Sequence, residues 1–320
     1  MRKFLVTGGC GFIGSHLVDA LIAKGHGVRV LDNLSTGSIE NLNPRAEFVR
    51  GDVTDKSAVT AAMADAAGCF HLAALSSVTR SNEDWLATHR NNQTGSLVVF
   101  DTARAGGAIP VVYASSAAVY GEQLHLPIAE TATLTPLTAY GADKVGSELH
   151  GRVAWLRHRV PNVGLRIFNA YGPRQDARRS HSGAISTFVD RLLTNKSLTI
   201  HGDGGQVRDF VHVTDVVDHL LAAMSLERKD AQVVNVCTGT GTTVTELIDI
   251  LAAAAKTAPR IVRAEPRSGD IRASVGDPAR ARKLLQVDAA ISLADGVADL
   301  VARAMRGPRD AFEQLDEVSD

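Results

Sequence analysis

A tyrosine and a lysine four positions apart, Tyr140 and Lys144, have the residue types and the spacing of an acid–base pair. Residues at i and i+4 lie on one face of a helix, so both side chains can reach the same ligand. An ammonium group beside a phenol favours the phenolate and lowers the pKa of the phenol. Such a tyrosine can remove a hydroxyl proton while hydride leaves the same carbon. Alone, the pattern is as typical of a solvated helix face, so its meaning depends on the other motifs.

Three glycines near the N-terminus, Gly8-x-x-Gly11-x-x-Gly14, follow a short apolar run and open a helical pattern. Glycines permit a tight turn, and backbone N–H groups at the following helix N-terminus can bind a pyrophosphate. Asp32 ends the second apolar run, where a carboxylate accepts hydrogen bonds from ribose hydroxyls and repels a 2′-phosphate. Residues 33–37 contain no Arg or Lys. The sequence therefore predicts an NAD site, the alternative being a glycine-rich turn without a ligand.

Alternating strand and helix patterns in the first half of the chain would position both motifs. Strands are expected at 3–7, 28–31, 47–49, 69–72, 110–114 and 163–168, and helices at 12–24, 57–66, 84–105 and 140–158. This alternation predicts an α/β fold with a Rossmann-type, doubly wound parallel sheet.

The pattern loosens after Asn169. Helices are expected at 184–194, 215–224, 244–255 and 293–304, and strands at 198–200 and 233–236, with Asp215 as a helix cap. We expect residues 1–168 to form the NAD-binding domain, with returning segments from about 205–245. Residues 169–307 should form mainly a smaller, mixed α/β substrate-binding lobe, and residues 308–320 an acidic tail.

The composition excludes several classes of protein. Hydrophobic residues make up 45% and charged residues 22% of the 320, so the chain is neither disordered nor fibrous. The formal net charge of −1 argues against nucleic-acid binding as the main task. No apolar run approaches the roughly 18–20 residues of a membrane span. The three cysteines lack metal-ligand or CxxC spacing, which favours a reducing compartment. A soluble cytoplasmic protein without a metal site is expected.

With these motifs the sequence resembles the extended short-chain dehydrogenase/reductase family, and within it the nucleotide-sugar 4-epimerases. The resemblance runs from about residue 2 to about residue 304. Further motifs occur in the family's order: Gly51-Asp52-Val53, His71-Leu72-Ala73-Ala74, Asn92-Gln93-Thr94-Gly95, Ser115-Ser116-Ala117-Ala118-Val119-Tyr120-Gly121, Arg166-Ile167-Phe168-Asn169, Arg208-Asp209-Phe210-Val211-His212-Val213 and Arg267-Ser268-Gly269-Asp270.

The resemblance implies a role for each group of residues. Ser116 would hold the sugar 4-oxygen beside Tyr140, and Lys144 would bind the nicotinamide ribose. Asp52 and Val53 would flank the adenine, and Asn92 would support the geometry of the catalytic helix. The remaining cofactor residues would be Gly8, Gly11, Phe12, Ile13, Gly14, Asp32, Asn33, Leu72, Ala73 and Ala74. The substrate residues would be Ser76, Ser116, Asn169, His201, Arg208, Arg267, Asp270 and Ser274, four of which, Asn169, Arg208, Arg267 and Asp270, would hold the nucleotide diphosphate. A homodimer through the helices at 84–105 and 140–158 is also implied.

The residues after Ser116 favour epimerisation. Members of the family that eliminate water carry an Asp-Glu pair there, and decarboxylases carry a Glu. This chain has Ala117 and Ala118, which cannot act as acid or base. A 4-keto intermediate would then regain hydride on its opposite face, with NAD bound throughout. Three alternatives stay open: an NAD-dependent oxidoreductase or ketosugar reductase, a 4-epimerase of a UDP-uronic acid or other nucleotide sugar, and a non-catalytic NAD-binding protein.

One position bears on the sugar. In the family, the residue four beyond Asp270 packs near the sugar 2-substituent, and a large tyrosine there excludes N-acetyl groups. Ser274 removes that block. We therefore expect UDP-GlcNAc and UDP-GalNAc to be accepted, with or without UDP-Glc and UDP-Gal. His201 would line the base pocket or be an ordinary loop histidine, and Ser76 stands where some epimerases carry a lysine near the sugar.

Overall fold

A parallel sheet forms the centre of the molecule and confirms the expected fold class. The computed structural model describes residues 1–176, 183–227, 229–266 and 269–306. Within them, seven parallel strands lie in the order β11-β6-β5-β4-β1-β2-β3. Their bounds are β1 Lys3–Thr7, β2 Gly27–Asp32, β3 Glu47–Arg50, β4 Gly68–His71, β5 Val111–Ser116, β6 Asn162–Ile167 and β11 Asp230–Val236. Because all run the same way, their carboxyl ends share one edge, and the loops that follow β1, β2, β4 and β5 meet there.

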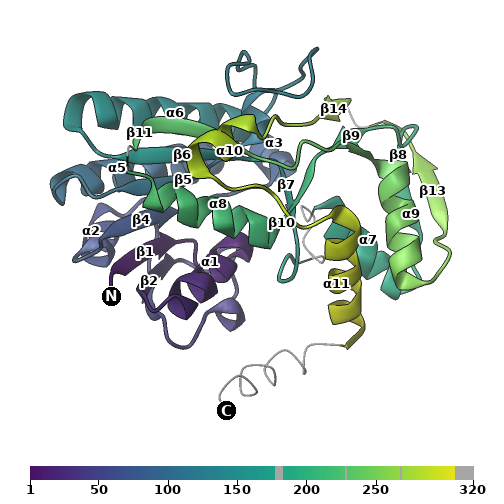
Figure 1. Cartoon of the computed structure of the whole chain (residues 1–320), viewed down its shortest axis with the longest axis horizontal. Coiled ribbons are helices and arrows are strands. Elements are labelled where there is room, and N and C mark those ends of the chain that lie inside the picture. The colour runs from purple at the N-terminus through teal and green to yellow at the C-terminus, as the bar shows by residue number, and fades with distance from the viewer. Residues whose placement is uncertain (177–182, 228, 267–268, 307–320) are drawn as a thin grey trace.

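Helices cover both faces of this sheet (Figure 1). The helices α1 (Phe12–Ala23) and α8 (Val213–Ser225) pack together over one hydrophobic core. The second core lies under α2 (Lys56–Met63), α5 (Gly95–Ala105) and α6 (Ala139–His158). Both cores consist mainly of valine, leucine, isoleucine and phenylalanine, and burying such side chains stabilises the fold by about 1.5–3 kcal/mol each.

The helix expected over 84–105 is interrupted. It consists of α4 (Trp85–His89), a π-helical turn at Arg90–Thr94 and α5. The π turn brings Asn92, which is buried, against the loop after β4. The short helix α3 (Val78–Glu83) precedes this segment and was not expected.

A second lobe with its own core stands beside the sheet (Figure 1). Its helices are α7 (Ala184–Leu193), α9 (Val244–Ala255) and α11 (Leu293–Arg306), packed with the paired strands β8 (Leu198–His201) and β13 (Ile261–Ala264). Short strands connect the lobes: β7 Asn169–Tyr171 pairs with β10 Phe210–His212, and β9 Val207–Arg208 lies between β12 Thr242–Thr243 and β14 Ala273–Ser274. The helix α10 (Ala279–Leu285) returns to pack on β11 and α8. The predicted tail, 308–320, lies outside the described residues.

The cap predicted for α8 is wrong. The helix begins at Val213, where the ring of His212 accepts a hydrogen bond from the Thr214 backbone. Asp215 is instead buried, and its carboxylate accepts hydrogen bonds from the backbone N–H groups of Ala290 and Ile291. It therefore ties α8 to a segment 75 residues later.

Candidate active site

The glycine turn after β1 shapes a binding surface. Gly8 has a φ of +71°, and a side chain there would place its Cβ 2.7 Å from the backbone nitrogen of Ala73. A Cβ on Gly14 would lie 2.1 Å from the carbonyl oxygen of Gly8. Gly11 caps α1 without a side-chain hydrogen bond, so the first N–H groups of the helix are available to an anion.

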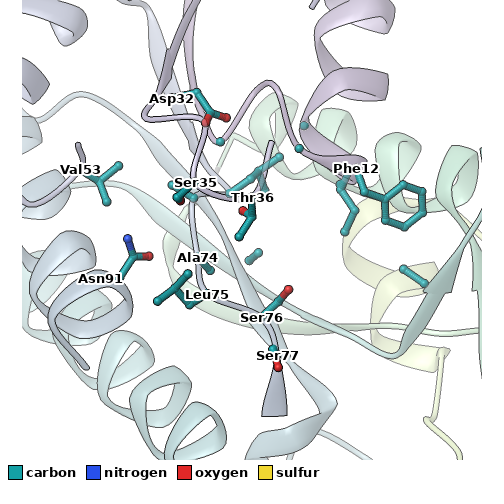
Figure 2. A pocket seen from close by; sticks show the side chains of 18 of the residues that line it. Phe12, Asp32, Ser35, Thr36, Val53, Ala74, Leu75, Ser76, Ser77 and Asn91 are labelled. Carbon is teal, nitrogen blue, oxygen red and sulfur yellow. The ribbon is translucent and has the colours of Figure 1, made fainter. Parts of the chain in front are cut away.

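A cavity of about 600 Å³ opens over this turn and extends along the carboxyl edge of the sheet. It is lined by most of the residues predicted to bind the cofactor and by all three predicted catalytic residues. Those that line it are Gly8, Gly11, Phe12, Ile13, Gly14, Asp32, Asn33, Val53, Leu72, Ala73, Ala74, Ser76, Ser116, Tyr140 and Lys144. In Figure 2, Asp32 and Ser77 mark opposite ends of the labelled residues, with Ala74, Leu75 and Ser76 between them.

Asp32 is held in place by the backbone around it. One carboxylate oxygen accepts a hydrogen bond from the Cys10 N–H at 3.0 Å, and the other from the Leu34 N–H at 2.8 Å. Each oxygen keeps a further lone pair for a hydroxyl donor. The glycine turn and this oriented carboxylate together fit a dinucleotide with a free ribose diol.

Two predicted cofactor residues support the cavity wall from behind. The carboxylate of Asp52 accepts hydrogen bonds from the Asn33 side chain at 2.8 Å and from Thr54, and it does not line the cavity. Asn92 bonds through its side chain to both the N–H and the carbonyl of Leu75. The amide of Asn92 thus fixes the loop after β4, and the support expected from it for the catalytic helix stays a prediction.

The three predicted catalytic residues line the cavity, where Tyr140 contacts both Ser116 and Lys144. Ser116 is the last residue of β5, and its hydroxyl accepts a hydrogen bond from the Ala118 N–H at 3.2 Å. Helix α6 begins after Thr138, whose hydroxyl caps the Gly141 N–H at 3.0 Å. A Cβ on Gly141 would lie 2.6 Å from the carbonyl of Ala118, so the start of α6 packs tightly against the turn after Ser116.

The chemistry of the pair differs from the sequence expectation in one respect. Burial raises the pKa of Tyr140, and a hydrogen bond to Ser116 acts in the opposite direction. The ammonium of Lys144 lies 5.6 Å from the centre of the Tyr140 ring and donates a hydrogen bond to the carbonyl of Ala114 at 2.8 Å. In the protein alone, burial therefore outweighs the hydrogen bond with Ser116, and the pKa of Tyr140 lies above its ordinary value.

Lys144 is buried, and this lowers its pKa from 10.5 to about 8, against the opposite effect of the carboxylates of Asp143 and Glu148. Between pH 8 and 10.5 the unfolded chain binds more protons, so stability should rise with pH across this window. Lys144→Met should make the NAD-free protein more stable at pH 7 by on the order of 2 kcal/mol. The difference should vanish by about pH 10.5. Urea unfolding at several pH values measures it, and a difference that does not change with pH would contradict this account.

Four of the predicted substrate residues, Asn169, Arg208, Asp270 and Ser274, form a second group between the lobes. The guanidinium of Arg208 pairs with the Asp270 carboxylate at 2.5 Å, and the strand register places Ser274, which is buried, opposite Arg208. The amide of Asn169 donates a hydrogen bond to the carbonyl of Asp209 at 3.2 Å. These residues do not line the cavity, so their roles stay predictions.

Two predictions in this region need separate mention. The ring of His201 bonds to the carbonyl of Glu265 at 3.1 Å and does not line the cavity. Its role in the base pocket also stays a prediction. Arg267 lies outside the described residues.

The structure adds cavity residues that were not predicted. Seven of them are polar or charged and come from the loop after β2 and from the segment after β7: Ser35, Thr36, Ser38 and Asn41, and Arg174, Gln175 and Asp176. The polar run that follows Asp32 was a usable signal for the first set. In residues 1–176, 183–227, 229–266 and 269–306 no cluster of three or more His, Cys, Asp or Glu side chains could hold a metal ion.

Comparison with known proteins agrees with this geometry. A profile of the NAD dependent epimerase/dehydratase family matches residues 4–237. The chain belongs to this family. It is 37% identical to UDP-glucose 4-epimerase of Mycolicibacterium smegmatis over 307 residues, 93% of this chain and 97% of that protein. The expected resemblance, the isomerase class and NAD as the cofactor are thereby confirmed.

Solved structures of the epimerase/dehydratase family have the same fold. UDP-glucose 4-epimerase from Thermotoga maritima, solved with UDP-glucose, superposes with a TM-score of 0.92 at 35% identity over 95% of this chain and 99% of that one. UDP-N-acetylglucosamine 4-epimerase from Methanobrevibacter ruminantium, in complex with UDP-N-acetylmuramic acid, gives 0.91 at 31% identity over 95% and 98%. Within the described residues, no helix is both long and apolar enough to cross a membrane.

Proposed function

We propose that this protein is a nucleotide-sugar 4-epimerase that interconverts the C4 epimers of a UDP-hexose with tightly bound NAD. The observation that carries the proposal is the contact of Tyr140 with Ser116 and Lys144 in the lining of a cavity that also fits a dinucleotide. The turn after Ser116 offers only the methyl groups of Ala117 and Ala118, so it provides no acid or base for elimination.

The reaction assigns a distinct task to each residue. Bound NAD would supply the acceptor, and later the donor, for the hydride at C4. Ser116 holds the 4-oxygen against Tyr140, which takes the hydroxyl proton and gives it back when the sugar is reduced again. Tyr140 can accept this proton only as the phenolate, and the ammonium of Lys144 stabilises that form. The sugar must turn over between the two transfers, which requires a cavity wall without groups that fix one face.

The substrate class follows from the relatives and from Ser274. Relatives named for UDP-glucose and for UDP-N-acetylglucosamine both support a UDP-sugar. We propose UDP-Glc/UDP-Gal, UDP-GlcNAc/UDP-GalNAc, or both, with residues 1–168 and the returning segments binding NAD and the lobe 169–307 binding the nucleotide sugar. The alternatives are a UDP-uronic acid or another nucleotide sugar, and an NAD-dependent oxidoreductase acting on a nucleotide sugar.

A cytoplasmic homodimer is part of the proposal. Apolar side chains stand exposed on α4 and α6, namely Trp85, Leu86, Leu149, Val153 and Leu156. A second copy of the chain would cover them. Light scattering of the pure protein reports whether its mass is that of a dimer.

The proposal is tested by proton NMR on the purified protein with no NAD added. UDP-Glc, UDP-GlcNAc and UDP-GlcA are supplied separately, and the anomeric signal of each 4-epimer is followed. Conversion of UDP-Glc or UDP-GlcNAc supports the proposed epimerase with retained NAD. Conversion of UDP-GlcA alone favours the uronic acid alternative, and no conversion even with NAD⁺ added contradicts an epimerase for all three.

Ser274→Tyr is expected to narrow the sugar specificity. A phenol at this position would overlap an acetamido group on C2 but not a hydroxyl. The variant should lose UDP-GlcNAc turnover by about 100-fold, equivalent to roughly 3 kcal/mol, while UDP-Glc turnover changes little. Measuring kcat/KM for both sugars tests this, and a parallel loss on both would place Ser274 away from the 2-substituent.

A further inference from the structure

Two loops of different lobes border the cavity. One follows β2 and contributes Ser35, Thr36, Ser38 and Asn41, and the other follows β7 and contributes Arg174, Gln175 and Asp176. The two loops lie far apart in the amino-acid sequence. Both are tied to α1 by a single carboxylate that does not itself line the cavity, that of Asp19.

Asp19 uses each carboxylate oxygen for a different loop. One accepts a hydrogen bond at 2.7 Å from the side chain of Asn43, which lies in the connection between β2 and β3 that forms this loop. The other pairs with the Arg174 guanidinium at 2.7 Å. Each partner of this ion pair is about one-third exposed, 35% for Arg174 and 34% for Asp19, so the pair is partly shielded from solvent.

The segment that carries Arg174 is fixed by further contacts. His16, one turn before Asp19 on α1, bonds through Nε2 to the carbonyl of Pro173 at 2.9 Å. Burial lowers the pKa of His16, which keeps the ring neutral at pH 7. Arg174 has a φ of +65°, a conformation that a non-glycine residue keeps only where its surroundings hold it. The segment is therefore docked on α1 at several points, and Asp19 connects it to the opposite loop.

We propose that Asp19 is a positioning residue that holds both loops against the dinucleotide cavity and thereby slows the release of NAD. The proposal rests on the proposed function, in which NAD must stay bound through every cycle. A dinucleotide that fills the cavity leaves when the walls separate, and Asp19 restrains both of them. A different role for Arg174 makes the opposite prediction: if it binds phosphate and Asp19 only competes for it, removing the charge at position 19 would slow release.

Asp19→Asn keeps the shape of the side chain and removes its charge. In the NAD-loaded protein it should speed NAD dissociation by about 3- to 10-fold, a range expected for a partly shielded ion pair. The released NAD is followed by enzymatic cycling after gel filtration, without sugar. Arg174→Gln should act similarly, and the double variant should be no faster than the faster single variant, since both remove one interaction.

Asp299→Asn is the matched control. It breaks a pair of equal length, Arg303–Asp299 at 2.7 Å, on α11 and away from the cavity lining, and should leave the release rate unchanged. If Asp19→Asn lowers the melting temperature but leaves NAD release unchanged or slower, the proposal is overturned. Should that variant fail to fold, Asn43→Ala tests the other contact, with faster release again expected. Faster release in a protein that converts no sugar would uphold this inference while the proposed function fails.

Discussion

Tyr140→Phe is expected to lower kcat by about 10³-fold while the protein keeps its bound NAD, because general acid–base groups contribute about 10²- to 10⁴-fold. The ring and its packing remain, and only the phenol oxygen beside Ser116 is lost. The loss should appear in kcat more than in KM, since the phenol oxygen interacts with the transferred proton in the transition state. Epimer formation by NMR and the NAD content of the same sample measure both quantities.

Tyr171→Phe is the matched control for this change. Tyr171 is buried, and its hydroxyl has no hydrogen-bond partner among the described residues, so its removal leaves no group unsatisfied. This variant should keep wild-type turnover within about twofold. Wild-type turnover in the Tyr140 variant with NAD bound would show that another group moves the proton.

Gly14→Ala is expected to abolish NAD binding. The added Cβ would lie 2.1 Å from the Gly8 carbonyl oxygen and 2.9 Å from the Gly9 Cα, and backbone atoms on both sides cannot rotate away as a side chain can. The turn must open, which separates the N–H groups that would hold the pyrophosphate. We expect NAD affinity to fall by more than about 100-fold, with a stability loss in the upper part of the 1–3 kcal/mol usual for overpacking. Calorimetric titration of the NAD-free variant with NAD⁺ measures the affinity, and urea unfolding measures the loss of stability.

Gly27→Ala serves as its control in the same βαβ unit. A Cβ on Gly27 would meet its nearest neighbour, the Lys3 side chain, at 3.7 Å, an ordinary contact. This variant should bind NAD as the wild type does. Equal NAD affinity of the Gly14 and Gly27 variants would mean that the turn after β1 does not hold the cofactor.

The expected elements agree best with the structure where the sequence pattern is local. The helix over 244–255 has the predicted bounds, and its capping box, Thr243 with Glu246, lies within four residues of sequence. The helix over 84–105 is less regular than its pattern, because the π turn that places Asn92 against Leu75 depends on a loop 17 residues earlier. Asp215 also depends on distant residues. Its residue type and position suit a helix cap, but its hydrogen-bond partner Ala290 lies 75 residues later in the chain.

The sequence by itself determined which residues we expect to carry the chemistry. The glycine turn, Asp32, Tyr140 and Lys144 were predicted from residue type and short spacing, because a turn, a strand end and one helix face are local structures. Ser116 was predicted from the resemblance to the family. Only the tertiary structure decided the rest. Burial reverses the expected direction of the Tyr140 pKa, since desolvation depends on everything packed around the ring. The bridge from Asp19 to Asn43 and Arg174 exists because packing brings distant loops to one helix, and no local pattern marks it.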